Sequence, residues 1–237
     1  MLHVDNLSYQ ILKQVSFSLD HDQNLTILGS NGSGKTTLAK AICHLIHTDN
    51  VMIEGKGISH LSSRERAKII NFIPAKLSIY DEYLTVLDYL QLNVLESIAS
   101  DQLDHVLELL GITHLKHSQC QKLSSGESAL LLIGGAMIHS ARYSILDEPT
   151  ANLDQAKKIK VYHLLKDSSY FQNKIIITHD LNLAYKLGYD ILFLEEGEVH
   201  YYGTSAQFFE SNHIKKTFNN TVKNIDGNFV VNYDENL

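Results

Sequence analysis

Short runs of alternating apolar and polar residues fill the first part of the chain and predict strands. Such alternation has the period of a strand, because successive side chains point to opposite faces of a sheet. VSFSL (15–19) alternates in this way, and NLTILG (24–29) is a mostly apolar run that ends in glycine. LHVDNLSY before them and VMIEG (51–55) predict two further strands. We expect these strands to form an antiparallel sheet around the glycine-rich segment that follows.

The middle of the chain changes to a helical pattern. A capping-box spacing in SSRE predicts the start of a short helix over 62–69, and INFI then predicts a strand. Apolar residues at i, i+3, i+4 and i+7 predict helical structure from 85 to 111. The segment 127–139 is dense in apolar residues and predicts another helix.

Strands and helices alternate in the rest of the chain, which predicts a mostly parallel sheet. The predicted strands are 143–147, 174–179 and 190–203, the last of which folds into a hairpin at Glu196-Gly197. The predicted helices are 155–166, 181–188 and 204–218, and the tail GNFVVNYDENL adds a short strand and a polar end.

Composition and charge narrow the class of protein. The 237 residues carry a formal net charge of −7, which argues against a general nucleic-acid binder. Hydrophobic residues make up 44% of the chain and charged residues 20%, as expected for a soluble globular protein. Cys43 and Cys120 stand far apart and indicate reduced thiols in a cytosolic protein. No secretory signal or membrane span is expected, because the longest apolar run, 129–138, is too short.

Thirteen histidines raise the question of a metal site. His44 and His47 are three residues apart, as are His114 and His117, so each pair could share one face of a helix. Neither pair has a third ligand nearby in the sequence or a cysteine cluster. We therefore interpret these residues as surface histidines.

The segment ILGSNGSGKTTLAKAI (27–42) fits the phosphate-binding pattern G-x-x-x-x-G-K-[ST]. Glycines let successive backbone N–H groups point inward around an anion, and the following helix adds its positive end. Lys35 would place its charge on the terminal phosphates, and the Thr36 hydroxyl would reach a magnesium ion. The residues expected to bind a nucleoside triphosphate here are Gly29, Ser30, Asn31, Gly32, Ser33, Gly34, Lys35, Thr36 and Thr37.

A hydrophobic strand that ends in Asp147 and Glu148 places two carboxylates at the edge of the sheet where α/β folds bind ligands. We expect Asp147 to hold magnesium, directly or through water, and Glu148 to polarise the attacking water. An acidic pair after a strand is weakly specific by itself. LSSGES (123–128), upstream of the pair, could be a plain helix N-cap.

Together and in this order, these motifs resemble those of the ATP-binding subunit of an ABC transporter, over essentially the whole chain. LSSGE resembles the family signature LSGGQ. ANLD (151–154) resembles the loop after the acidic pair, and THD (178–180) resembles the segment with the switch histidine. Tyr9 stands where the family places an aromatic residue that stacks on adenine.

The resemblance implies an α/β fold of the P-loop NTPase class. A RecA-like core sheet with an N-terminal antiparallel β subdomain would occupy 1–75 and 140–237 of a single domain, and a helical signature subdomain about 76–139. The family's cofactors would be ATP and Mg²⁺.

The resemblance also implies how the site works. Two copies would pair head to tail, so that the signature of one copy contacts the γ-phosphate held by the other. His179 would bridge the γ-phosphate and Glu148, and these two residues with Lys35 are the expected catalytic residues. Asp154 would line the dimer seam. The signature residues expected to contact ATP are Ser124, Ser125, Gly126 and Glu127.

Several positions depart from the family pattern, among them Ser128, Ala129 and Leu130, which replace basic residues just after the signature. Ala75 stands where the family has a glutamine that reaches magnesium and the attacking water, and alanine can do neither. Ser125 replaces the second glycine of the signature, and Glu127 replaces its glutamine. Either this is a working ATPase with drifted accessory positions, or it is slow or dependent on a partner copy. Because losing one transition-state contact lowers a rate about 10²- to 10³-fold, we expect slow rather than absent hydrolysis.

A separate single module resembles the ATPases of bacterial importers, and LSSRERAKIINFIPAK with EYLTVLDYL resembles those that serve iron–siderophore, haem or cobalamin uptake. We expect import of iron chelates, with another metal or an oxyanion as the alternative. The expected partners are a second copy, membrane permease subunits docked on the helical insert near 76–120, and a periplasmic or lipoprotein substrate-binding protein. The expected location is cytoplasmic, on the inner face of the cell membrane.

A different class of function stays open. The chain could be an ATP-gated dimerising module with little hydrolysis, which the changes at Ala75 and Glu127 favour. A metabolic P-loop kinase is disfavoured, because it would not need the signature, ANLD and the switch histidine together.

Overall fold

The computed structural model describes residues 1–167 and 169–233. Its centre is a six-stranded sheet in which five neighbouring strands are parallel and one edge strand is antiparallel. In spatial order the strands are β10 (Glu198–Gly203), β9 (Asp190–Glu195), β3 (Leu25–Leu28), β8 (Asn173–Thr178), β7 (Tyr143–Asp147) and β6 (Ile70–Ile73). Both neighbours of β3 therefore come from the C-terminal half of the chain.

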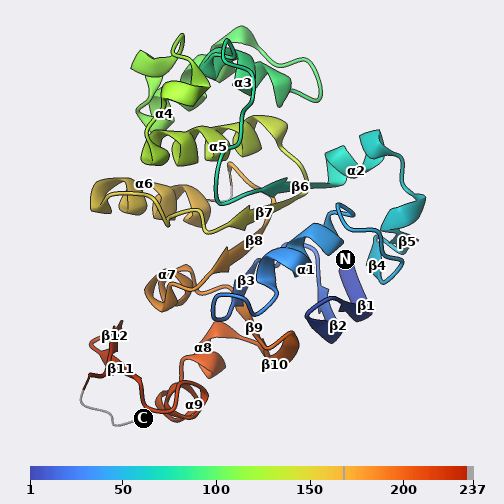
Figure 1. Ribbon diagram of the computed structural model, residues 1–237, viewed down its shortest axis with the longest axis vertical. Helices are drawn as coiled ribbons and strands as arrows, with labels where there is room; N and C mark the ends of the chain where they lie inside the picture. Colours follow the sequence, from blue (N-terminus) through green and yellow to red (C-terminus); the bar gives the residue numbers. More distant parts are fainter. Residues whose placement is uncertain (168, 234–237) are drawn as a thin grey trace.

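A second sheet is antiparallel and lies beside the first (Figure 1). Its strands, in spatial order, are β2 (Leu12–Leu19), β1 (Leu2–Tyr9), β4 (Val51–Ile53) and β5 (Lys56–Gly57). Buried residues alternate with exposed ones along part of β2, as expected for a sheet with one face on the core. The predicted α/β class, with a parallel core sheet and an antiparallel N-terminal sheet, is confirmed. The predicted strand 24–29, however, is β3 of the parallel sheet and not part of the antiparallel one.

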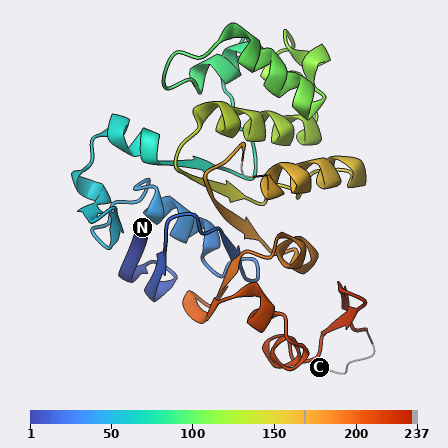
Figure 2. The ribbon, with the colours of Figure 1, turned by 180° about the vertical axis from the view of Figure 1, so that it is seen from behind.

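Helices cover both faces of the core sheet, as the two views of the ribbon show (Figures 1 and 2). Successive residues of β7 point to opposite faces, so Ile145 packs in one cluster with α1 and Leu146 in another with α6. Three further helices, α3, α4 and α5, form a layer at one end of the molecule (Figure 1). The helices are α1 (Lys35–Ile42), α2 (Ser63–Ile69), α3 (Val86–Leu92), α4 (Ser100–Leu110), α5 (Ser125–His139), α6 (Gln155–Lys166), α7 (Leu181–Leu187), α8 (Ser205–Phe208) and α9 (Ser211–Thr217), with 3₁₀ turns at Ile58–His60, Thr113–Leu115 and Cys120–Lys122.

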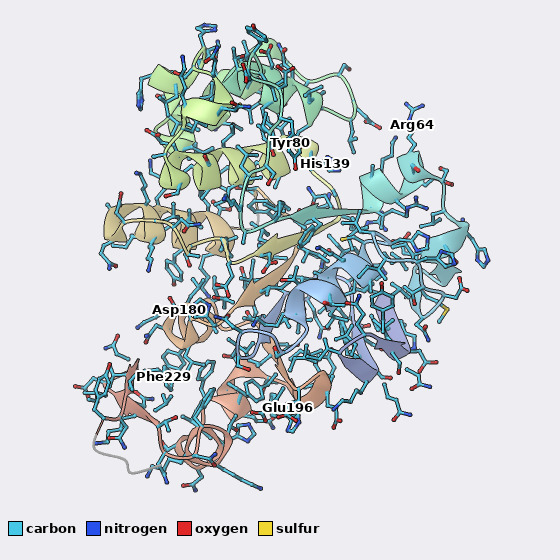
Figure 3. All side chains as sticks on the ribbon, viewed as in Figure 1. Arg64, Tyr80, His139, Asp180, Glu196 and Phe229 are labelled. Atoms are coloured by element: carbon cyan, nitrogen blue, oxygen red, sulfur yellow. The ribbon has the colours of Figure 1, made fainter. Side chains whose placement is uncertain are left out.

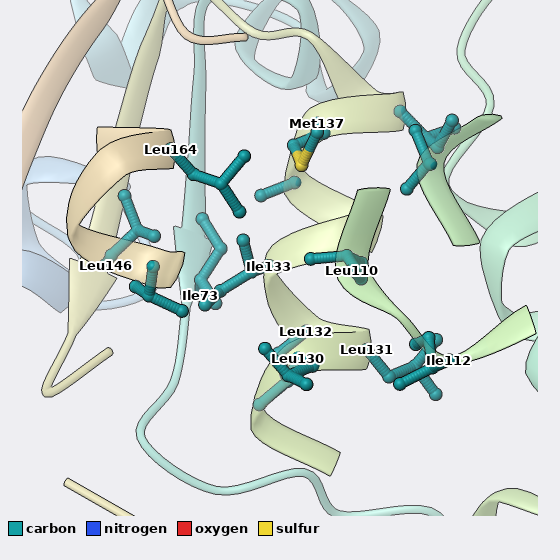
Figure 4. Close-up of a cluster of buried hydrophobic side chains, with 14 of the residues drawn as sticks. Ile73, Leu110, Ile112, Leu130, Leu131, Leu132, Ile133, Met137, Leu146 and Leu164 are labelled. Carbon is teal, nitrogen blue, oxygen red and sulfur yellow. The ribbon is translucent and has the colours of Figure 1, made fainter. Parts of the chain in front are cut away.

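Helix α5 joins the helical layer to the core sheet. It is apolar on nearly all sides and buried over most of its length, because α4 packs on one side and β6 and α6 lie on the other. Figure 4 shows the contact: Leu130 to Ile133 and Met137 of α5 lie among Leu110, Leu146 and Leu164. The signature segment at the start of α5 is thereby fixed to a rigid element.

The structure corrects two predicted helices. The helical stretch 85–111 is two helices, α3 and α4, because Asn93 ends the first and the segment that follows it is not helical. The stretch 204–218 is also two short helices, because Phe209 and Glu210 lie outside both helices and separate α8 from α9. The sequence pattern did not predict β11 (Val222–Ile225), which pairs with β12 (Asn228–Val231) in a C-terminal hairpin.

The polar end of the tail, 234–237, lies outside the described residues. In the part of the chain that the structure describes, no helix combines the length and the apolar character needed to cross a membrane. The division into subdomains at 75/76 and 139/140 stays a prediction.

Candidate nucleotide-binding site

The glycine-rich loop connects β3 to α1 at the carboxyl end of the parallel strands. Gly29 has φ +155°, and a Cβ there would lie 2.2 Å from the Leu194 carbonyl oxygen of the neighbouring strand. Gly34, with φ +105°, occupies the N-cap of α1 and has no side chain to cap the helix. The first backbone N–H groups of α1 therefore point to the loop without a side-chain acceptor, which is the arrangement that binds phosphate.

Lys35 lies inside this loop. Its Nζ donates hydrogen bonds to the carbonyl oxygens of Gly29 and Ser30, each at 2.8 Å, and the residue is buried. Burial lowers the pKa of Lys35, while the carboxylates of Glu148 and Asp147 act in the opposite direction. A cation is thus fixed beside the loop, where the outer phosphates of a nucleotide would lie.

Thr36 and Asp147 bring two oxygen ligands together. The Thr36 hydroxyl donates to Asp147 Oδ2 at 2.7 Å, across 111 positions of sequence. Burial raises the pKa of Asp147, and the hydrogen bond from Thr36 opposes that rise. A hydroxyl and a carboxylate at this spacing fit Mg²⁺, which prefers oxygen ligands and takes others from the phosphates.

Glu148 follows directly and is held by three contacts. Its backbone is left-handed, with φ +49°, and its N–H donates to the Ile177 carbonyl oxygen at 2.8 Å. Oε1 lies 2.7 Å from His179 Nδ1, and Oε2 accepts from the Thr178 hydroxyl at 3.2 Å. Since a carboxylate only accepts, Nδ1 of His179 carries the proton in this pair. The predicted base and the predicted switch histidine are therefore direct neighbours.

Lys35, Thr36, Asp147 and Glu148 line one cavity of about 290 Å³, whereas Gly29, Ser30 and His179 line another. Most of the predicted phosphate-binding and acidic residues meet in the first cavity, and Ala75 lies in its wall, as expected from the position of the family glutamine. The lining residues are Ile11, Asn31, Gly32, Gly34, Lys35, Thr36, Thr37, Ala75, Asp147 and Glu148.

Two residues near this cavity differ from what the sequence suggested. Tyr9, predicted to stack on adenine, ends β1 and is partly exposed, but it is not among the residues that line the cavity. Ile11, two positions later in the turn to β2, lines it instead. The sequence does not predict this role of Ile11, because nothing in a lone isoleucine in a turn indicates which surface it covers.

The start of α5 is closed by its own side chains. Ser124 caps the helix, and its Oγ accepts from the Glu127 N–H at 3.3 Å. In return Glu127 Oε2 accepts from the Ser124 N–H at 2.8 Å and from the Ser124 hydroxyl at 2.7 Å. These hydrogen bonds lower the pKa of Glu127. The plain N-cap interpretation of LSSGES is therefore correct for the isolated chain.

The signature residues and the phosphate loop are not brought together within one chain. Ser125 lines a separate groove, and a Cβ on Gly126 would lie 3.3 Å from the carbonyl oxygen of Asn152, in the loop after the acidic pair. Asp154, at the end of that loop, caps α6 by accepting from the Lys157 N–H at 2.9 Å. The signature and this loop thus form one surface, and the nucleotide cavity forms another.

The family model for the ABC transporter matches residues 12–151 of this chain. This chain belongs to the ABC transporter family. The match covers more than half of the chain and includes the phosphate loop, the signature and the acidic pair. As an ABC transporter ATP-binding subunit, the chain has ATP as its substrate.

Relatives among the ABC transporters serve different cargo. The chain is 31% identical to the zinc import ATP-binding protein ZnuC of Mannheimia succiniciproducens, over 73% of this chain and 62% of the relative. It is 29% identical to the hemin import ATP-binding protein HmuV of Hydrogenovibrio crunogenus, over 84% and 83%. Among solved structures, the dimeric post-hydrolysis state of an ATP-binding cassette with ADP and Pi matches with a TM-score of 0.75 at 22% identity, covering 86% of this chain and 99% of that one. At that identity the likeness shows the fold.

Proposed function

We propose that this chain hydrolyses ATP to drive an ABC importer, as one of two nucleotide-binding subunits on a membrane permease. The observation that supports hydrolysis most directly is the convergence of Lys35, Asp147 and Glu148 on one cavity, with His179 bonded to Glu148. A cation, an ion-binding carboxylate and a second carboxylate with a bonded histidine are the groups that phosphoryl transfer to water requires.

Each residue has a distinct role in this proposal. The loop N–H groups and Lys35 bind the phosphates, and Glu148 accepts a proton from the attacking water. His179, bonded to Glu148, holds the γ-phosphate in line with that water. Thr36 and Asp147 would hold Mg²⁺, which neutralises charge on the phosphates when it is bound.

We propose a head-to-tail homodimer as the active form. The signature surface of one copy lies away from its own nucleotide cavity, so a second copy is needed to bring Ser125 and Gly126 to the γ-phosphate. The dimeric cassette with ADP and Pi supports this arrangement, because that protein shares the fold over most of this chain.

A groove of about 770 Å³ between the signature helix and the segment after Ala75 is the proposed contact with the permease. Ser125, Ser128 and Asn152 line one side, and the segment from Ala75 to Tyr80 lines the other. Tyr80 is 94% exposed and lies beside the helical layer (Figure 3). A groove that touches both Ala75 and the signature would transmit movement of the permease to both halves of the site.

For the cargo we propose an iron chelate, either a ferric siderophore or haem. The sequence pattern around 62–90 and the hemin-importing relative support this choice. The zinc-importing relative keeps another metal as the alternative. A substrate-binding protein would deliver the cargo to the permease, and this chain would lie on the inner face of the membrane.

An ATP-gated dimerising module with little hydrolysis is the second candidate, and Ala75 favours it. Its methyl group lines the nucleotide cavity where a glutamine would supply polar contacts to the ion and the water. Replacing Ala75 by glutamine separates the two candidates. A rise in turnover would show that Ala75 limits hydrolysis, whereas an unchanged turnover would remove Ala75 as support for the second candidate.

Turnover by the purified chain tests the proposed function. We expect ATP hydrolysis in the wild type that the Glu148→Gln variant lacks, and we expect ATP to produce dimers of that variant in light scattering. Hydrolysis that survives Glu148→Gln would contradict the assignment of the base. Dimers of both proteins without any turnover would favour the second candidate.

Uptake in cells tests the cargo. A strain that lacks this chain should lose accumulation of radioactive iron supplied as haem or siderophore and keep accumulation of radioactive zinc. The wild-type gene should restore uptake and the Lys35→Ala gene should not. Loss of zinc accumulation alone would assign the alternative.

A further inference from the structure

Both carboxylate oxygens of Glu148 are bound by successive residues at the end of β8. The Thr178 hydroxyl contacts Oε2 at 3.2 Å, and His179 Nδ1 contacts Oε1 at 2.7 Å. The roles assigned above use His179 and leave Thr178 without a function. Thr178 is the last residue of β8 and directly follows three isoleucines.

The two contacts differ in how firmly they are held. Thr178 is fully buried and pairs in register with Leu28 of β3, the last residue before the phosphate loop. The His179 side chain is 59% exposed. Because β8 is paired with parallel strands on both sides, we expect the Thr178 hydroxyl to keep its position when nucleotide binds.

A second hydrogen bond fixes the direction of this hydroxyl. The Asp180 N–H donates to Thr178 Oγ1 at 3.1 Å. A hydroxyl has one proton, so with an acceptor site occupied by this N–H its own proton points to Glu148. Thr178 therefore presents a donor to a carboxylate that must itself remain a proton acceptor for catalysis.

The Asp180 amide is in turn held by the C-terminal part of the fold. Asp180 Oδ1 accepts from the N–H groups of Asn182 and Leu183, at 2.9 and 3.1 Å, and caps α7. The Asn182 side chain exchanges two hydrogen bonds with the backbone of Phe229 in the C-terminal hairpin, at 3.0 and 2.7 Å. Figure 3 shows Asp180 and Phe229 in this region of the molecule. The donor that directs the Thr178 hydroxyl is thus part of a hydrogen-bonded network.

We propose that Thr178 is a positioning residue for Glu148, and this proposal rests on the proposed hydrolytic function. The left-handed backbone of Glu148 leaves its side chain without support from a regular element. Thr178 fixes one oxygen of the carboxylate, so the other stays aimed at the attacking water when His179 turns to the γ-phosphate. Its effect is on the rate of the chemical step and not on nucleotide binding.

Substitution of the hydroxyl tests this role. We expect Thr178→Val to lower kcat about tenfold to hundredfold, because misplacement of a catalytic group by about 1 Å has effects of this size. KM for ATP and ATP-induced dimerisation should change little, because Thr178 does not line the nucleotide cavity. Thr178→Ser keeps the hydroxyl and should restore most of kcat.

Thr26 of β3 provides the matched control. It is also a fully buried threonine of the core sheet, and its Oγ1 has no hydrogen-bond partner among the described residues. Thr26→Val should therefore leave kcat at the wild-type value. Thermal unfolding of all variants separates effects on folding from effects on the rate.

Two results would overturn the proposal: an unchanged kcat in Thr178→Val, or an equal loss of kcat in Thr178→Ser and Thr178→Val that follows their loss of thermal stability. In both cases hydrolysis that depends on Glu148 would leave the proposed function intact. Absence of Glu148-dependent turnover in the wild type would instead remove the proposed hydrolytic function, and this inference with it.

Discussion

Two helix N-termini in this protein are assigned to the same phosphate groups, yet they are built in opposite ways. Helix α1 begins at Gly34 with no side-chain cap and no acidic residue in its first turn. Helix α5 begins at Ser124 with a complete capping box and with Glu127 in its first turn. One end leaves its N–H groups to a ligand, and the other satisfies them from its own chain.

The difference teaches which end can bind ATP alone. The α1 end combines uncapped N–H groups with the Lys35 cation, so it attracts an anion in the single chain. The α5 end carries a carboxylate whose pKa is held low, so it stays negative at neutral pH where a partner's phosphate must approach. We therefore expect ATP to bind first at the α1 end of one copy. The α5 end of the partner copy then closes on the phosphates against the repulsion from Glu127.

The largest expected effect is at the cation of the α1 end. Lys35→Ala should lower ATP turnover about 10²-fold or more, because it removes the positive charge that stabilises the negative charge developing on the phosphates. Lys157 lies beside the α5 end, where it forms a partly exposed ion pair with Asp154 at 3.1 Å, and such pairs contribute little. Lys157→Ala should retain most of the turnover. Equal losses in the two variants, measured by phosphate release, would remove the proposed difference between the ends.

A smaller effect is expected on stability, from the glycine at each end. Gly34→Ala should lower the free energy of unfolding by about 1–3 kcal/mol, because its φ is +105° and the new Cβ would lie 2.8 Å from Leu12 Cδ2. Gly126 has no positive φ, and its nearest contact would be 3.3 Å. Gly126→Ala should therefore change the free energy by less than about 1 kcal/mol. Urea unfolding of both variants measures these free energies. A larger loss of stability for Gly126→Ala than for Gly34→Ala would contradict the expected difference.

Removing the charge at the α5 end should strengthen closure. Glu127→Gln preserves the capping box and should tighten ATP-induced dimerisation a few-fold, since a charge near a helix end contributes about 0.3–1 kcal/mol. Glu65→Gln is the control, because Glu65 forms the same capping box with Ser62 on α2, away from the nucleotide cavity.

The pH dependence of this effect has a defined sign. Hydrogen bonds from Ser124 lower the pKa of Glu127, so the charge persists until the pH falls below the ordinary carboxyl range. The advantage of Glu127→Gln should thus be constant across neutral pH and disappear only in acid. The stabilisation that the ionised Glu127 gives to α5 is likewise present above the pKa of the unfolded chain and lost as pH falls through the lower folded pKa. An advantage that already fades near neutral pH would contradict the charge argument.

The smallest expected effect is a change in unfolding temperature at Asp147, the carboxylate beside the α1 end. Burial raises the pKa of Asp147, so its ionised form is disfavoured in the folded state at neutral pH. Asp147→Asn, which still accepts the Thr36 hydrogen bond, should raise the unfolding temperature at neutral pH while turnover falls. The gain should shrink as pH falls through the raised pKa, because the native carboxyl then becomes neutral. An unfolding temperature below that of the wild type at neutral pH would contradict this.

The parts of the site that are local in sequence could be predicted, and those that depend on strand order could not. The phosphate loop needs a strand, glycines and a helix within 27–42, so its shape follows from neighbouring residues. The contact between Thr36 and Asp147 spans 111 positions, and the sequence suggested it only through the assignment of both residues to magnesium. Thr178 was passed over because a buried threonine at a strand end has no distinguishing pattern.

The predicted helix boundaries were wrong where one sequence pattern fits either one long helix or two short ones. The apolar spacing in 103–110 correctly predicts α4, but it says nothing about the residues before it, where Asn93 ends α3. The aromatic residues in 204–218 favour burial in any element, and they form a cluster on β9 and β10 from two separate short helices. Helix breaks of this kind depend on what each segment packs against.

The place of β3 between β8 and β9 has a consequence for folding during synthesis. The strand that presents the phosphate loop emerges early, but its hydrogen-bonding neighbours are residues 173–178 and 190–195. The loop also needs Gly197 to be present. The Gly197 N–H donates to the Ser33 carbonyl oxygen, and the Gly197 carbonyl oxygen accepts from the Lys13 N–H. Contacts of such long sequence separation form late. During synthesis, a ribosome must therefore complete about four-fifths of the chain before the nucleotide can serve as a ligand that stabilises the nascent fold.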